Sequence, residues 1–255
     1  MLIVISPAKK LALQHIAPPL PATLPAFLDR SAELVGILRD MDSFQLSELM
    51  GISMKLADLN MQRFQTWHTP FTPANASPAL LAFQGDVYQG LQAETLDAEG
   101  LAFAQQHLCI LSGLYGLLRP LDLMQDYRLE MGTSLANPHG RDLYAFWGDA
   151  ITEALNRALS AQDDDVLVNL ASQEYFKAVR PGKLVGRIVT PLFREKKAGG
   201  YKIVGIMAKR ARGLMSRYII DRRISDPEAL KEFSIDGYRF NPKLSDDREW
   251  SFTRG

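Results

Sequence analysis

The chain has few of the cysteines and histidines that form disulfides or bind metal ions in other proteins. Cys109 is the only cysteine among 255 residues, which excludes an internal disulfide and a cysteine-rich zinc site. The histidines lie far apart without ligand spacing (His15, His68, His107 and His139). We therefore expect no metal, no cofactor and a reducing, cytoplasmic setting. Cys109 lies in an apolar stretch, which is typical of an inert core thiol.

Long hydrophobic runs are also missing. The apolar start, Leu2–Ile5, ends at Ser6-Pro7 and is too short for a signal peptide or a membrane span. No other run is long enough to cross a bilayer, so we expect no membrane association. Walker A, GxGxxG and GxSxG sequences are absent, which removes the common templates for nucleotide binding and for serine hydrolases.

What is present is typical of a globular protein. Hydrophobic residues make up 47% and charged residues 23%. Helical periodicity and short buried strands interleave, so we predict one mixed α/β domain over residues 1–255. Predicted strands are 2–5, 108–111, 166–170 and 250–252, with a hairpin of 188–193 and 201–207 around Gly199-Gly200. Predicted helices are 24–39, 43–50, 53–67, 97–107, 143–160 and 208–223, with Ser43 and Ser53 as N-caps of the second and third.

Net charge is zero, but the charge is unevenly distributed. Residues 177–223 hold fourteen lysines and arginines against Glu195 and Asp221, so the rest of the chain is acidic. Such asymmetry can concentrate a positive field on one face and attract phosphates. The alternative is a solvated face whose charges pair with the acidic remainder. Within the segment, Lys209, Arg210, Arg212 and Arg217 share a helix, and Gly213 lets another backbone approach.

The segment Leu49–Leu59 resembles the helix-hairpin-helix motif of DNA-repair and recombination proteins. Gly51, Ile52, Lys55 and Ala57 match it. Two positions depart from it, since Met50 stands where proline is common and Ser53 stands where a second glycine is usual. Backbone N–H groups at the start of the second helix can hold a phosphate oxygen, and Lys55 adds charge. We predict such an element at about residues 43–67. A structural turn between two helices is the alternative.

Polar segments follow the three predicted buried strands: 6–9, 112–122 and 169–175. Sites in open α/β sheets form at the carboxyl ends of strands, so the segments can converge on one cleft, roofed by residues 127–132. Lys9, Arg119 and Arg128 with the hydroxyls of Ser6, Ser112, Tyr115 and Ser172 suit an anion or a nucleotide. A desolvated Lys9 can act as base or nucleophile. The alternative places Lys9 on the surface and makes Arg119–Asp122 an ion pair that braces a loop.

Several of these stretches together resemble the bacterial YaaA family. The matching segments are 6–9 (SPAK), 85–88 (GDVY), 111–122 (LSGLYGLLRPLD), 127–132 (YRLEMG), 146–148 (FWG), 169–172 (NLAS) and 208–217 (AKRARGLMSR). The resemblance covers nearly the whole chain, and is weakest at 11–25 and over the last fifteen residues. It implies a single α/β domain of unusual topology, with a helix-hairpin-helix element and a basic cleft. It also implies DNA binding and cytosolic resistance to peroxide through limiting free iron and its damage to DNA. It fixes no reaction.

Two hypotheses follow. The first is a protective protein that binds double-stranded or branched DNA through phosphates, with Gly51, Ile52, Ser53, Lys55, Lys209, Arg210, Arg212 and Arg217 as contacts. The second is an enzyme for a nucleotide or another small anion, with Lys9, Ser112, Tyr115, Arg119 and Arg128 as candidate catalytic residues. The full expected cleft set is Ser6, Lys9, Asp86, Tyr88, Ser112, Tyr115, Arg119, Asp122, Arg128, Glu130, Asn169 and Ser172.

Overall fold

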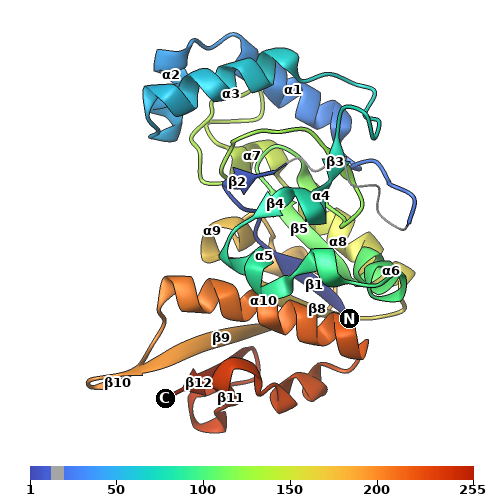
Figure 1. Ribbon diagram of the computed structural model, residues 1–255, viewed down its shortest axis with the longest axis vertical. Helices are drawn as coiled ribbons and strands as arrows, with labels where there is room; N and C mark the ends of the chain where they lie inside the picture. The colour runs from blue at the N-terminus through green and yellow to red at the C-terminus, as the bar shows by residue number, and fades with distance from the viewer. Residues whose placement is uncertain (13–19) are drawn as a thin grey trace.

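A mixed sheet runs through the middle and lower part of the molecule in the computed structural model, which describes residues 1–12 and 20–255 (Figure 1). Its strand order is β11-β12-β9-β8-β1-β5-β6, and β10 pairs with β9. The strands are β1 Leu2–Ile5, β5 Leu108–Ser112, β6 Gly116–Leu118, β8 Val166–Leu170, β9 Arg187–Lys197, β10 Gly200–Lys202, β11 Arg239–Phe240 and β12 Glu249–Arg254. Neighbours from β12 to β5 are parallel, and the two ends of the sheet are antiparallel.

The centre of this sheet is fully buried. Every residue of β1, β5 and β8 is buried, as expected for parallel strands covered on both faces. In the register, Val4 lies between Cys109 of β5 and Asn169 of β8. The carboxyl ends of the three strands therefore meet at one edge of the sheet. The predicted strands 2–5, 108–111 and 166–170 are confirmed.

Besides five short 3₁₀-helices, the described ranges contain ten α-helices. They are α1 Leu28–Arg39, α2 Ser43–Met50, α3 Met54–Thr66, α4 Ala79–Ala82, α5 Asp86–Leu91, α6 Ala98–His107, α7 Leu143–Trp147, α8 Ala150–Ala161, α9 Gln173–Phe176 and α10 Gly205–Arg222. Helices α1, α2 and α3 lie together at one end of the long axis (Figure 1). Two small ribbons complete the regular structure: β2 Lys10–Leu11 with β4 Phe83–Gln84, and β3 Ser77–Pro78 with β7 Leu123–Met124. No helix among the described residues is long and apolar enough to cross a membrane.

Helices α5 and α10 cross at unusually close range, because glycines stand at the contact. A Cβ at Gly213 would lie 1.8 Å from the Val87 carbonyl oxygen, and one at Gly90 would lie 2.2 Å from the Arg210 carbonyl oxygen. The expected role of Gly213 in close backbone approach is thus confirmed. The crossing anchors α10 and thereby fixes the direction in which its basic side chains point.

The structure corrects several predicted boundaries. The helix expected over 143–160 is two helices, α7 and α8, because Gly148 takes φ 52° and ψ −118° between them. The hairpin strand expected over 201–207 ends at Lys202, since the backbone enters α10 at Gly205. The helix expected from residue 24 begins at Leu28.

Two predicted N-caps are also revised. The cap of α2 is Asp42, not Ser43; its carboxylate accepts from the Gln45 amide, and the Gln45 side chain accepts from the Asp42 amide in return. Ser53 occupies the N-cap position of α3, but its side chain makes no capping hydrogen bond.

Candidate functional site

A pocket of about 390 Å³ opens at the carboxyl ends of β1 and β8. Ser6, Lys9 and Lys10 enter it from the chain that follows β1, and Ser172 from the chain that follows β8. Helices α5, α9 and α10 and the segment 127–130 close the other sides. The predicted convergence of polar segments at this edge therefore holds for the first and third strands and for the expected roof.

Two basic residues of the pocket share one carboxylate. Glu130 contacts Lys9 Nζ at 2.7 Å through Oε2 and Arg128 Nη2 at 3.1 Å through Oε1. Lys9 remains 64% exposed, so the expectation of a desolvated Lys9 is wrong and the surface alternative holds. Arg128 is mostly covered, and its buried Nε makes no hydrogen bond in the described part of the chain. That N–H therefore lacks an acceptor at the pocket wall.

Lys209 and Arg212 bring further positive charge from α10. They are three residues apart and therefore lie on the same face of the helix. Among the described residues, neither side chain makes a hydrogen bond or an ion pair, and desolvation lowers the pKa of the Arg212 guanidinium. A partly buried cation without a counterion is costly, so this face of the pocket favours an anion.

Hydroxyl groups make the hydrogen bonds that hold the base of the pocket together. The Ser172 amide donates to Ser6 Oγ at 2.8 Å, which ties the ends of β8 and β1 together. The Tyr88 hydroxyl donates to the Ser6 carbonyl oxygen at 3.1 Å. Burial raises the pKa of Tyr88, as well as those of Tyr127 and Tyr175 in the pocket wall. These phenols are neutral at physiological pH and serve as wall and hydrogen-bonding groups.

Three residues of the expected cleft set, Ser112, Tyr115 and Asn169, do not line the pocket. Ser112 is fully buried behind the wall, where its Oγ and the Tyr127 hydroxyl are 2.7 Å apart. Tyr115 is equally buried; its hydroxyl accepts from Trp67 Nε1 and from the Gln125 amide. Asn169 accepts the Ala171 amide within its own turn.

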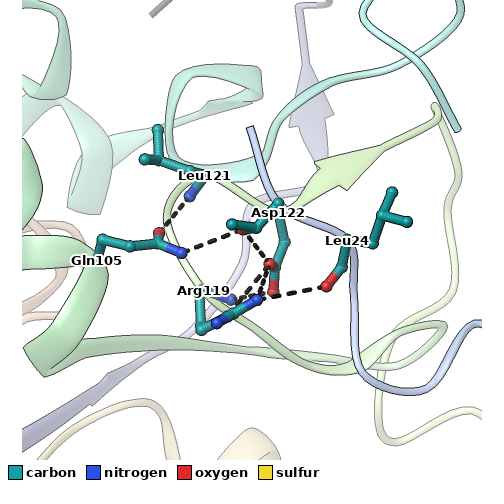
Figure 2. Close-up of polar contacts among 6 residues, drawn as sticks. Leu24, Gln105, Arg119, Leu121 and Asp122 are labelled. Atoms are coloured by element: carbon teal, nitrogen blue, oxygen red, sulfur yellow. Dashed lines mark hydrogen bonds and ion pairs between the residues drawn. The ribbon is translucent and has the colours of Figure 1, made fainter. Parts of the chain in front are cut away.

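Arg119 and Asp122 form a separate cluster (Figure 2). Asp122 is 2% exposed; its carboxylate accepts from the Arg119 amide at 2.7 Å and from Arg119 Nη2 at 3.0 Å. The Thr23 hydroxyl donates to the same carboxylate. This geometry is that of an ion pair that braces a loop, the alternative considered for these two residues, and it lies outside the pocket.

The turn between α2 and α3 presents the predicted hairpin features to solvent. Gly51 takes the left-handed conformation with φ 60°, and Ser53 and Lys55 are exposed. The Leu56 and Ala57 amides bond to the Ser53 carbonyl oxygen, as in an ordinary first turn. Ala57 is fully buried, which agrees with a small residue at the helix interface.

Several unpaired cations lie on an arm made of the end of β9, β10 and the start of α10 (residues 195–210), which we call the basic arm. Within the described ranges, its exposed members form no ion pair: Lys196, Lys197, Lys202, Lys209 and Arg210. Arg217 differs from them. Its guanidinium bonds to the Leu91 and Gln92 carbonyl oxygens and pairs with Asp221, so it is occupied by α5 and by its own helix.

The expected cleft set left out several residues that line the pocket, among them Lys10, Gln84, Tyr127, Glu174 and Tyr175. Glu174 and Tyr175 directly follow Ser172, so the convergence argument already pointed at their segment. Lys10 and Gln84 face each other across a two-residue ribbon. Strands of two residues are too short to produce a recognisable hydrophobic periodicity in the sequence.

No group of three or more His, Cys, Asp or Glu side chains forms a metal-binding cluster in the described part of the chain, which leaves out His15. Cys109 is a buried free thiol, and burial, with a smaller contribution from Asp122, raises its pKa to about 12. The thiolate that reacts with peroxide is therefore scarce at neutral pH, and the expected core role of Cys109 is confirmed.

The fold and the site define a mixed α/β protein with a cation-lined pocket at the carboxyl edge of its parallel strands. The family model described as peroxide stress protein YaaA matches residues 1–244, so the chain belongs to this family. It is also similar to the UPF0246 protein RSc2009 of Ralstonia nicotianae, with 59% identity over 256 residues, covering 100% of this chain and 99% of the relative. The family assignment supports a role in peroxide stress.

Proposed function

We propose that the protein protects DNA during peroxide stress by binding it through phosphate contacts and limiting iron-dependent oxidative damage. Proteins that neutralise DNA phosphates release the cations condensed around them. Ferrous iron held near the backbone is such a cation, and it converts peroxide into a damaging radical next to the sugar. Occupation of the phosphates therefore removes the reactive metal from its target without a protein metal site.

The observation that carries this proposal is the unpaired charge of the basic arm. Elsewhere in the basic segment 177–223 several cations are paired: Arg180 and Lys183 both bind Asp149, and Arg187 contacts Glu228. On the arm, exposed lysines stand at the end of β9 and on β10 without a counterion in the described ranges. Exposed unpaired cations gathered on a projecting hairpin are typical of phosphate-backbone binding.

The turn at Gly51–Ser53 supports a second contact. Ser53 leaves the first amides of α3 without a side-chain cap, and Lys55 stands exposed beside them. The α2–α3 pair and the basic arm lie toward opposite ends of the long axis, with the elements of the pocket between them (Figure 1). A duplex that touches both must therefore run along the molecule, and a long footprint is expected.

Fluorescence anisotropy with labelled duplex and branched DNA over a salt series tests the proposal. The triple variant Lys196→Gln, Lys197→Gln, Lys202→Gln is expected to bind more weakly and to flatten the salt slope by about 3 if each lysine neutralises one phosphate. Lys183→Gln is the matched control, because Lys183 is exposed but pairs with Asp149. Absence of binding at low salt, or binding that ignores salt, contradicts the proposal.

Strand nicking by ferrous iron and peroxide tests the protective part. Wild-type protein is expected to reduce nicking in step with DNA occupancy, and the triple variant to protect less at equal concentration. Equal protection by both proteins would show that DNA occupancy is not the cause.

A further inference from the structure

The pocket holds cationic donors that the described chain does not satisfy. The Arg212 side chain makes no hydrogen bond or ion pair there, and the buried Arg128 Nε has no acceptor. Buried N–H donors almost always find partners, and an unsatisfied charged one is especially costly. A cation desolvated beside an open cavity is therefore explained if a ligand supplies the missing acceptors.

The balance of charge favours a doubly charged ligand group. Glu130 already serves Lys9 and Arg128, whereas Lys209 and Arg212 face the cavity together without a carboxylate partner in the described ranges. A guanidinium offers paired N–H donors that match phosphate oxygens, and an ammonium adds a point charge. Two adjacent cations suit the dianion of a phosphate monoester better than the single charge of a diester.

The size of the pocket and an unpaired carboxylate in its lining describe the rest of the ligand. About 390 Å³ is far larger than an inorganic anion needs and lies within the range of small-molecule sites. Asp86, the first residue of α5, lines the pocket and makes no ion pair among the described residues. A carboxylate accepts hydrogen bonds, so it suits the hydroxyl or amino groups of a sugar or a base.

We propose that this pocket binds a phosphate monoester of nucleotide size, with its phosphate on Arg212 and Lys209 and its sugar or base donors on Asp86. This site goes beyond the proposed DNA contacts, since it takes a free small molecule. Of the basic arm it uses Lys209 alone, and it needs neither the lysines of β9 and β10 nor Lys55. Its ligand is selected by the doubly charged terminal phosphate, which internal DNA phosphates lack.

Calorimetric titration of the full chain tests the site. The probes are the four ribonucleoside 5′-monophosphates, their nucleosides, the 3′,5′-cyclic nucleotides and inorganic phosphate. We expect at least one monophosphate to bind saturably, and its nucleoside and its cyclic diester to bind at least about tenfold more weakly, since hydrogen bonds to charged groups contribute that much. Failure of all four monophosphates at millimolar concentration overturns the inference, and so does equal binding of inorganic phosphate or of the cyclic diester.

Two neighbouring substitutions on α10 locate the site. Arg212→Met keeps bulk while removing the charge, and is expected to weaken monophosphate binding by about 10- to 100-fold. Arg210→Gln is the matched control, because Arg210 is exposed and outside the pocket lining, and it is expected to leave affinity unchanged. Unchanged affinity of the Arg212 variant overturns the placement. The probe comparison on wild-type protein decides the ligand class even if that variant does not fold.

The same proteins separate this inference from the DNA proposal. Loss of DNA binding in the triple lysine variant with intact monophosphate binding supports two sites. Monophosphate binding without any DNA binding by the wild type removes only the DNA proposal. DNA binding without monophosphate binding removes only the pocket ligand.

Discussion

Tyr115, expected as a candidate catalytic residue, instead uses its hydroxyl for hydrogen bonds inside the core. Its hydroxyl accepts from Trp67 Nε1 and from the Gln125 amide, each at 3.1 Å, and it donates to the Gln125 carbonyl oxygen at 3.2 Å. All of these groups are buried. Loss of the hydroxyl would leave two N–H donors without an acceptor in the interior.

Tyr115→Phe is therefore expected to lower the free energy of unfolding by about 1–3 kcal/mol and to leave ligand and DNA affinity unchanged. Urea denaturation measures the first effect and titration the second. Tyr201→Phe is the control, because the Tyr201 hydroxyl bonds only weakly to the Gly255 carbonyl at an exposed position. A Tyr115→Phe protein of full stability with reduced ligand binding would return Tyr115 to the site.

The candidate site was partly predictable at this scale. Ser6, Lys9 and Ser172 reach the pocket because parallel strands end at one edge, and that rule needs only the positions of the strands. Ser112 ends β5 and Arg119 follows β6, but Ser112 lies behind the wall, and Arg119 pairs with Asp122. Side-chain partners within a loop decide this, and a pattern of residue types does not specify them.

At the scale of elements, the crossing of α5 and α10 connects backbone packing to the pocket. Gly213 brings α10 against the Val87 carbonyl oxygen, and Arg212 beside it lines the cavity. Any side chain at residue 213 must push the two helices apart. The position of the Arg212 guanidinium then changes with them.

Gly213→Ala is expected to destabilise the fold by about 1–3 kcal/mol or more, because overpacking forces backbone shifts. It is also expected to weaken ligand binding at the pocket. Gly36→Ala on α1 is the opposite control: nothing lies within 4 Å of its added Cβ, so a gain of about 0.5–1 kcal/mol from helix propensity is expected. Thermal unfolding of both variants measures the contrast. Equal effects of the two substitutions would show that the close approach is not what matters.

Elements were easier to predict than their arrangement. The buried strands were recognisable in the sequence as short apolar runs, and Gly213 was correctly expected at a close contact. The order of strands in the sheet depends on pairings between residues more than a hundred positions apart, such as Ile3 with Leu108 and Val168. The break at Gly148 arises from a backbone conformation that helical periodicity on either side conceals.

For the whole molecule, buried phenols connect folding to alkaline pH. Burial is the largest cause that raises the pKa of Tyr88, Tyr115, Tyr127, Tyr175 and Tyr238 above their ordinary value. Tyr238 also donates a hydrogen bond to the Glu195 carboxylate, which further favours its neutral form. These residues lie in the pocket wall, in the core and next to β9. The raised pKa values are therefore spread over several parts of the fold.

Proton linkage gives the direction in which stability changes with pH. Below about pH 10 both the folded and the unfolded chains keep these phenols protonated, so stability is unaffected. Above that pH the unfolded chain loses protons that the folded chain retains. Each phenol then removes about 1.4 kcal/mol of stability per pH unit until its folded pKa is reached. With five such groups, a typical stability of about 5–15 kcal/mol is exhausted within roughly one to two pH units.

Absorbance at 295 nm and far-ultraviolet circular dichroism, recorded together over an alkaline titration, test this account. Ionisation of the five buried phenols is expected to coincide with a cooperative loss of secondary structure above pH 10. Tyr127→Phe removes one titrating group, so its protein is expected to lose stability less steeply with pH, whatever its stability at neutral pH. Ionisation of every tyrosine near the ordinary pKa while the fold persists would show that solvent reaches these side chains. The pocket wall would then be open where the structure closes it.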